Sequence, residues 1–83
     1  MISLFFTKSA QKQLLKLEKN VQLRIADALD ILLTEPQPQN LDIKKLRSPL
    51  NGHRLRIGDY RILYVKESNE ITIYHIAHRR DAY

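Results

Sequence analysis

The chain contains no cysteine and no long apolar run, and both absences narrow what it can be. Without cysteine, disulfide bonds and thiolate metal sites are excluded. No apolar stretch approaches the ~20 residues that a transmembrane helix needs. The first six residues are mostly apolar, but they lack a basic leader and a cleavage site, so they predict a strand and not a signal peptide. We therefore expect a soluble, cytoplasmic protein with no membrane partner.

Internal repeats, low-complexity segments and linkers are also missing. The 83 residues therefore predict a single domain, 1–83, and a hydrophobic content of 43% is enough for a modest core.

Carboxylates are absent between Ile43 and Gly58, a stretch that carries five cations. The whole chain has a net charge of +5, and its two halves differ. Residues 1–40 carry five basic and four acidic side chains, whereas residues 41–83 carry nine and five, with six of the seven arginines. Charge concentrated in one half favours a binding face for a polyanion over general solubility.

The N-terminal half predicts a strand and two helices. Residues 2–6 are β-branched and aromatic, and Thr7 can cap the helix that follows. Asn20 is the candidate cap of a second helix, which should end at Glu35-Pro36 because proline lacks a donor and clashes with the preceding turn. The apolar stripes are Ala10, Leu14 and Leu17 in the first helix and Val21, Ile25, Leu29 and Leu32 in the second.

The C-terminal half predicts a loop followed by a three-stranded meander. The loop contains Leu41, Ile43 and Leu46, and the expected strands are 52–57, 60–66 and 70–77. The order βααβββ predicts a two-layer α+β fold. In it, an antiparallel helical hairpin packs on one face of an antiparallel sheet, and the arginines lie on the other face.

Arginines alternate with aliphatic residues in the first strand of this meander. At a strand period of two, Leu55 and Ile57 lie on one face and Arg54 and Arg56 on the other. The turn at 58–59 then brings Arg61 back beside that pair. Guanidinium groups stay charged and present a planar fork of donors that suits phosphate. The pattern indicates a phosphodiester site for RNA or another polyanion, completed after the last strand by Arg79, Arg80 and Tyr83.

At these residues the chain resembles the RelE/ParE superfamily of bacterial and archaeal toxins. The resemblance covers essentially the whole length: the first strand, the helical hairpin, Lys45-Leu46-Arg47, the run from Gly52 to Tyr64, and the final HRRDAY of residues 78–83. It implies a RelE-like fold, membership of a type II toxin–antitoxin pair and a cognate, acidic, RelB-like antitoxin. Members of the RelE branch cleave messenger RNA on the ribosome, and members of the ParE branch poison DNA gyrase.

The RelE branch implies an endoribonuclease that uses neither metal nor cofactor, in which the substrate's own 2′-hydroxyl attacks the adjacent phosphate. The best-known members carry lysines where this chain has Arg54 and Arg56. Arg80 replaces Arg79 if the alignment shifts by one residue. The family's catalytic positions fall on Arg54, Arg56, Arg61, Arg79 and Tyr83. Contacts to RNA or to an acidic partner are expected from Lys44, Lys45, Arg47 and Arg80.

These arguments leave open which residue takes the proton from the 2′-hydroxyl. Arginine is a poor base because its pKa lies above 12. Tyr83 can serve if the surrounding guanidinium groups favour its ionised form. His75 and His78 are the other titratable candidates, and His75 shares strand parity with Arg79.

Two other functions fit the same residues. A ParE-like inhibitor of DNA gyrase would bind its target and perform no nuclease chemistry. A toxin remnant would keep only the ability to bind its antitoxin.

Overall fold

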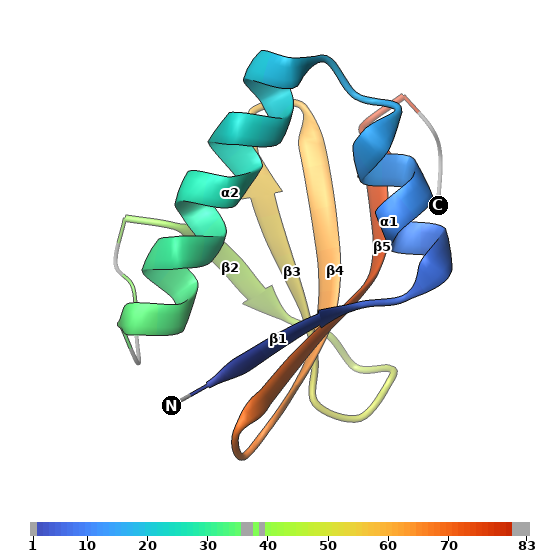
Figure 1. Ribbon diagram of the computed structural model, residues 1–83. Helices are drawn as coiled ribbons and strands as arrows, with labels where there is room; N and C mark the ends of the chain where they lie inside the picture. The colour runs from blue at the N-terminus through green and yellow to red at the C-terminus, as the bar shows by residue number, and fades with distance from the viewer. Residues whose placement is uncertain (1, 36–37, 39, 81–83) are drawn as a thin grey trace.

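Two helices cover one face of a five-stranded sheet in the computed structural model (Figure 1). The structure describes residues 2–35, 38 and 40–80 of the chain. The elements, in chain order, are β1 (Ser3–Phe6), α1 (Lys8–Leu15), α2 (Lys19–Thr34), β2 (Asp42–Lys45), β3 (Gly52–Ile57), β4 (Tyr60–Glu67) and β5 (Glu70–His78). The predicted α+β class is confirmed, and the three strands of the meander begin where the sequence places them and end within one residue of it.

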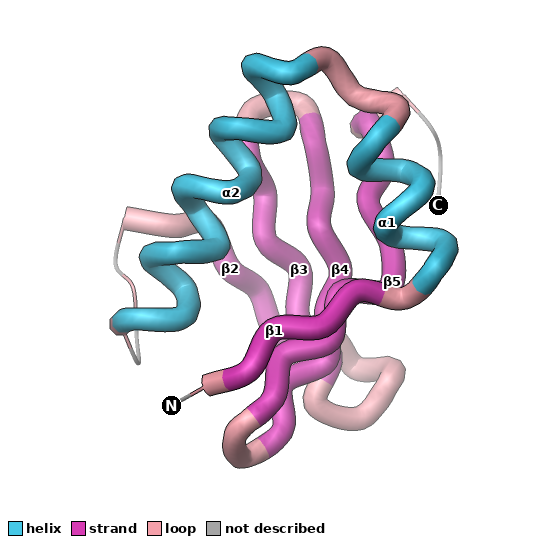
Figure 2. The backbone as a smooth tube through the Cα atoms, viewed as in Figure 1, coloured by secondary structure: helices cyan, strands magenta, loops and turns pink. Residues whose placement is uncertain are grey.

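The strands lie in the order β1-β5-β4-β3-β2, which Figure 2 shows as one curved sheet. The prediction of a wholly antiparallel sheet is wrong, because β1 runs parallel to β5. Leu4 lies opposite Ile71 and Phe6 opposite Ile73. Parallel neighbours need a long connection, and here the rest of the domain supplies it.

Residues 42–45 were expected to lie in a loop, but they form strand β2. The predicted order βααβββ is therefore one strand short. The residues of β2 pair antiparallel with β3, with Asp42 opposite Arg56 and Lys44 opposite Arg54. Three of its four side chains are charged, and only Ile43 packs against the core. Such a short segment shows no apolar alternation, and its pairing with β3 is what makes it a strand.

The helices begin at two different kinds of cap. The Thr7 hydroxyl accepts a hydrogen bond from the Ala10 N–H at 3.2 Å, as predicted for α1. The prediction that Asn20 caps α2 is wrong: Glu18 is the N-cap, and its carbonyl accepts hydrogen bonds from the N–H groups of Val21 and Gln22. The helix ends at Thr34, as expected. The two helices diverge from their connection, α1 over β5 and α2 over the β3 side (Figure 1).

The core lies between the helices and the sheet. Its fully buried large side chains are Ile25, Leu55, Ile62, Tyr64, Ile71 and Ile73. Within the described residues, no polar or charged side chain other than tyrosine is buried there. None of the helices in this part of the chain is both long enough and apolar enough to cross a membrane.

Candidate functional site

The face of the sheet that turns away from the helices gathers the arginines. Leu55 and Ile62 lie opposite each other and are fully buried, which places their neighbours Arg56 and Arg61 opposite each other on the outer face. Directly opposed residues of an antiparallel pair have Cβ atoms about 4.5–5.5 Å apart. The prediction that Arg61 returns beside the β3 pair is therefore confirmed. Like charges so close destabilise the free protein, so the arrangement favours an anion between them.

Two adjacent hollows lie on this face. The first, which we call the arginine pocket, has a volume of about 120 Å³ and is lined by Arg56, Gly58, Asp59, Arg61 and Arg79. The second, the leucine pocket, has a volume of about 330 Å³ and is lined by Lys44, Leu46, Arg54, Arg61 and Leu63. Arg61 lines both, so the two hollows are neighbours along the sheet.

Arg79 is held against the turn between β3 and β4. Its backbone N–H donates to the Asp59 carbonyl at 2.7 Å, and its side-chain Nε lies 3.8 Å from Asp59 Oδ1. Gly58 makes this turn at a φ of 56°, in the left-handed region that favours glycine. A Cβ there would also lie 2.8 Å from Nη2 of Arg24, a residue of α2. The turn thus brings Arg79 to the pair on β3 and β4, although it comes from far along the chain.

Arg61 has the most perturbed electrostatics of this group. Partial burial, followed by the positive charges of Arg56 and Arg54, lowers its pKa below the ordinary value for arginine. Each of these causes disfavours the charged form. A bound anion would relieve the repulsion, so this position is electrostatically prepared for negative charge.

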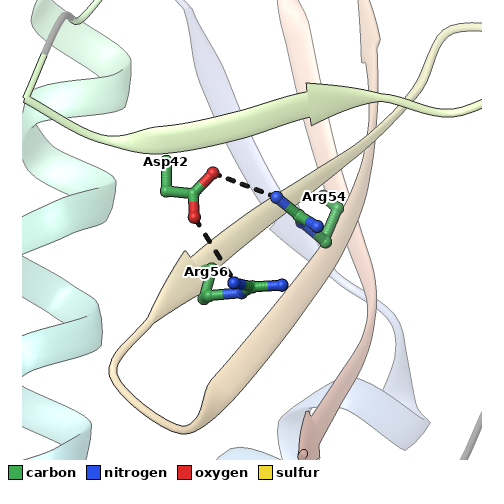
Figure 3. A network of polar contacts seen from close by, with 3 residues as sticks. All are labelled: Asp42, Arg54 and Arg56. Carbon is green, nitrogen blue, oxygen red and sulfur yellow. Dashed lines mark hydrogen bonds and ion pairs between the residues drawn. The ribbon is translucent and has the colours of Figure 1, made fainter.

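Asp42 is a site residue that the sequence analysis missed. Its Oδ1 accepts a hydrogen bond from Arg54 Nη2 at 3.0 Å, and its Oδ2 lies 3.9 Å from Arg56 Nε (Figure 3). The residue stands just before the carboxylate-free stretch and in a segment expected to be a loop. A signal was present, because Asp42 and Lys44 would share a face if residues 42–45 formed a strand.

The predicted RNA-contacting residues do not all join the pockets. Lys44 lines the leucine pocket. Lys45 lies opposite His53, and so on the other face of the strand pair, while Arg47 is exposed in the segment after β2. Arg80 is exposed in the turn after β5, where its N–H donates to His78 Nδ1 at 3.1 Å. Tyr83 lies outside the described residues.

Neither histidine candidate lines the arginine pocket. His75 and His78 line a separate hollow of about 420 Å³ beside α1. Its strand parity with Arg79 had left His75 a candidate for the same cleft, but in the structure it lines this other hollow. The Nε2 atom of Gln13, a residue of α1, lies 3.2 Å from His75 Nδ1.

Gln13 also fixes the tautomer of His75. Its Oε1 accepts a hydrogen bond from the Ile76 N–H at 2.7 Å, so its Nε2 is the atom that faces His75. An amide nitrogen can only donate. His75 Nδ1 is therefore the acceptor, and the ring proton is on Nε2. This histidine holds a helix against the edge of the sheet.

The described residues contain no group of three or more histidine, aspartate or glutamate side chains that could hold a metal ion.

Comparisons with known proteins agree with the fold. Residues 4–83 match the family described as "ParE toxin of type II toxin-antitoxin system, parDE". Toxin RelE3 of Methanocaldococcus jannaschii is 30% identical over 88 residues, which cover 99% of this chain and 96% of that protein. A RelE–RelB complex from Pyrococcus horikoshii OT3 is similar at a TM-score of 0.82 and 30% identity, covering 98% of each chain. A RelB–RelE antitoxin–toxin complex from Methanococcus jannaschii is similar at a TM-score of 0.78 and 26% identity, covering 92% of this chain and 91% of that one. The chain therefore belongs to the RelE/ParE superfamily of type II toxins, and to its RelE branch.

Proposed function

We propose that this toxin is an endoribonuclease that cleaves messenger RNA on the ribosome without a metal ion. The observation that carries the proposal is the arginine pocket. Guanidinium groups from β3, from β4 and from the turn after β5 line one hollow of about 120 Å³, on the outer face of a RelE-like sheet. A hollow of this size fits one phosphate group and its ester oxygens.

The proposed reaction is a transesterification within the RNA. The ribose 2′-oxygen forms a bond to the adjacent phosphorus, and the bond from that phosphorus to the 5′-oxygen of the next nucleotide breaks. The products are a 2′,3′-cyclic phosphate and a free 5′-hydroxyl. Negative charge builds up on the phosphate oxygens in the transition state, and Arg56, Arg61 and Arg79 are placed to neutralise it.

The leucine pocket would hold the neighbouring nucleotide. Leu46 and Leu63 offer an apolar surface for a base, while Lys44 and Arg54 supply charge for its phosphate. Lys45, Arg47 and Arg80 would contact phosphates farther along the RNA. Phosphate contacts position a nucleic acid, whereas contacts to bases select sequence.

Proton transfer is assigned to Tyr83 in this proposal. His75 and His78 line another hollow, and arginine is a poor base. Replacing Tyr83 by Phe removes one hydroxyl and keeps the ring, so single-turnover cleavage should collapse while ribosome binding survives. If the Phe variant cleaves at the wild-type rate and the Ala variant does not, the ring only stacks on a base, a contact worth about 1–3 kcal/mol.

The proposed partner is a cognate, acidic, RelB-like antitoxin in the cytoplasm. Two of the similar structures are described as complexes of RelE with RelB. A net charge of +5 and an open cationic face suit an acidic segment that folds on contact. It would neutralise the toxin by covering the arginines or by displacing the segment that carries Tyr83. If deletion of that segment leaves both antitoxin affinity and toxicity unchanged, displacement is the wrong explanation.

The decisive experiment supplies translating ribosomes with a defined message and maps the products by primer extension. We expect cleavage within the codon of the aminoacyl site, and none when the same message is free of ribosomes. Intact message in both arms would contradict the nuclease.

A second candidate function is inhibition of DNA gyrase. It is favoured by the family description that the chain matches, which names the ParE toxin. A supercoiling assay with purified gyrase separates the two functions. Trapped DNA cleavage complexes, together with intact message on the ribosome, would replace the first proposal by this one.

A further inference from the structure

A carboxylate stands among the arginines of the proposed RNA-binding face. Asp42 lies on the edge strand β2 directly opposite Arg56, yet its shorter contact is the diagonal one, at 3.0 Å to Arg54 Nη2 (Figure 3). The distance to Arg56 Nε is 3.9 Å. Since Arg54 lines the leucine pocket and Arg56 the arginine pocket, one carboxylate joins an arginine of each.

The two members of the closer pair differ in exposure. The Arg54 side chain is 17% exposed and that of Asp42 is 53% exposed, so solvent or a ligand reaches the carboxylate more easily than the guanidinium. The Nε atom of Arg54 is buried and makes no hydrogen bond within the described structure. Arg54 thus presents its charge to a ligand mainly through its two Nη atoms, of which Nη2 now contacts Asp42.

A carboxylate and a phosphate bind guanidinium in the same way, through two oxygens that accept from a planar fork. The oxygens of Asp42 lie near two arginines, as two phosphate oxygens would. A phosphate that engages Arg54 in full must therefore first replace Asp42.

We propose that Asp42 is an internal competitor for the phosphate at Arg54 and lowers the affinity of the free toxin for RNA. This inference rests on the proposed function, because it requires that the arginine face binds RNA. Asp42 holds the Arg54 guanidinium until an extended polyanion, which gains contacts to Arg61 and Arg79 as well, displaces the carboxylate. Asp42 therefore favours the binding of a ligand with several phosphates over the binding of a single anion.

The test compares Asp42→Asn with Asp27→Asn, which makes the same charge change at an exposed position of α2. Each variant is titrated with a labelled, short, single-stranded RNA oligonucleotide. Exposed ion pairs are weak, so we expect Asp42→Asn to tighten binding by roughly three- to fivefold beyond Asp27→Asn. The slope of affinity against salt should steepen by about one phosphate contact, because salt no longer helps to break an internal pair.

A double-mutant cycle identifies the partner of Asp42. In an Arg54→Ala background the gain from Asp42→Asn should vanish, since no guanidinium remains to be released. A gain that persists in that background would overturn the proposal, because the effect would then be general electrostatics. Binding by Asp42→Asn that is equal to or weaker than that of Asp27→Asn would overturn it too, and a lowered melting temperature would then show that Asp42 only holds β2 on β3.

A measurement on the wild-type chain avoids dependence on the folding of any variant. The NMR signals of the Arg54 guanidinium and the Asp42 carboxyl carbon should both move when the RNA is added. Unmoved signals during RNA binding, or no RNA binding by any variant, would overturn the proposal. The nuclease stands or falls on ribosomal cleavage instead, so a toxin that cleaves while the Asp42 signals stay still would sink this inference alone.

Discussion

The two faces of strands β3 and β4 differ in nearly every physical property although they are built from alternate residues of the same segments. On the inner face Leu55, Ile62 and Tyr64 are at most 1% exposed and pack under the helices. On the outer face Arg56 and Arg61 meet as like charges across the ladder. A shift of one residue in register would exchange the two faces, so burial of the aliphatic side chains also fixes where the cations lie.

This difference means that neighbouring residues should separate stability from activity. Changes on the inner face should lower the free energy of unfolding. Changes on the outer face should affect binding and catalysis in a protein that remains folded. A rigid, well-packed inner face also holds the guanidinium groups in place, which catalysis requires of a site.

The largest effect is expected from Ile62→Ala on the inner face. Ile62 is fully buried, and truncation of such a residue leaves a cavity and costs about 2–5 kcal/mol. Urea unfolding measures the change. The matched control is Leu63→Ala on the next residue, which is only partly buried and should cost clearly less. Equal losses at both positions would show that the two faces do not differ in packing.

The next largest effect concerns Arg61→Ala on the outer face. This arginine lines both pockets, and loss of one charge-stabilising donor at a reacting group typically costs ~10²–10³ in rate. We expect ribosomal cleavage and growth inhibition to fall by that factor while the melting temperature changes little. Loss of toxicity through loss of the folded state would instead make Arg61 a structural residue.

Alkaline pH should weaken the inner face through Tyr64. Burial raises the pKa of this phenol from 10.0 to about 12. Because the folded value is the higher one, its contribution is fully present below pH 10 and is lost as pH rises toward 12. The expected loss is about 1 kcal/mol near pH 11 and about 3 kcal/mol above pH 12. Unfolding in urea across this range should show a shallower decline for Tyr64→Phe, and identical curves would contradict the assignment.

The smallest effect is expected at the sheet edge, where Gln13 joins α1 to β5. Gln13→Ala would leave the Ile76 N–H without its acceptor, in a residue that is 4% exposed. An unsatisfied buried donor costs about 1–3 kcal/mol, and we expect the lower end because water can enter the neighbouring hollow. Gln11→Ala on the exposed face of the same helix should stay within about 0.5 kcal/mol. Thermal unfolding of the two variants decides this.

Local chemistry was sufficient for most elements of the fold. Thr7 has the side chain that a helix start needs, and the Gly58-Asp59 turn joins two segments of clear alternation. It was not sufficient for β2, because a four-residue strand with one core side chain carries almost no pattern of its own. Asn20 also has a capping side chain, yet the backbone around Glu18 starts the helix earlier.

The candidate site was predictable to the extent that it follows strand parity. Arg54, Arg56 and Arg61 lie on the face that alternation assigns to them. Asp42 was missed because its contact to Arg54 joins two strands whose pairing was not foreseen. Strand parity made His75 a candidate for the cleft of the arginines, but its ring contacts Gln13 of α1 and lines the hollow beside that helix.

The sequence by itself determined the α+β class, the strand and helix periods and the cationic outer face, since these depend on interactions between residues close in the chain. Only the tertiary structure decided that β1 runs parallel to β5, that Asp59 holds Arg79, and that Asp42 stands between two arginines. Each of these three contacts joins segments that are distant in sequence. Their formation depends on how the whole sheet and its helices pack, and no local pattern records that.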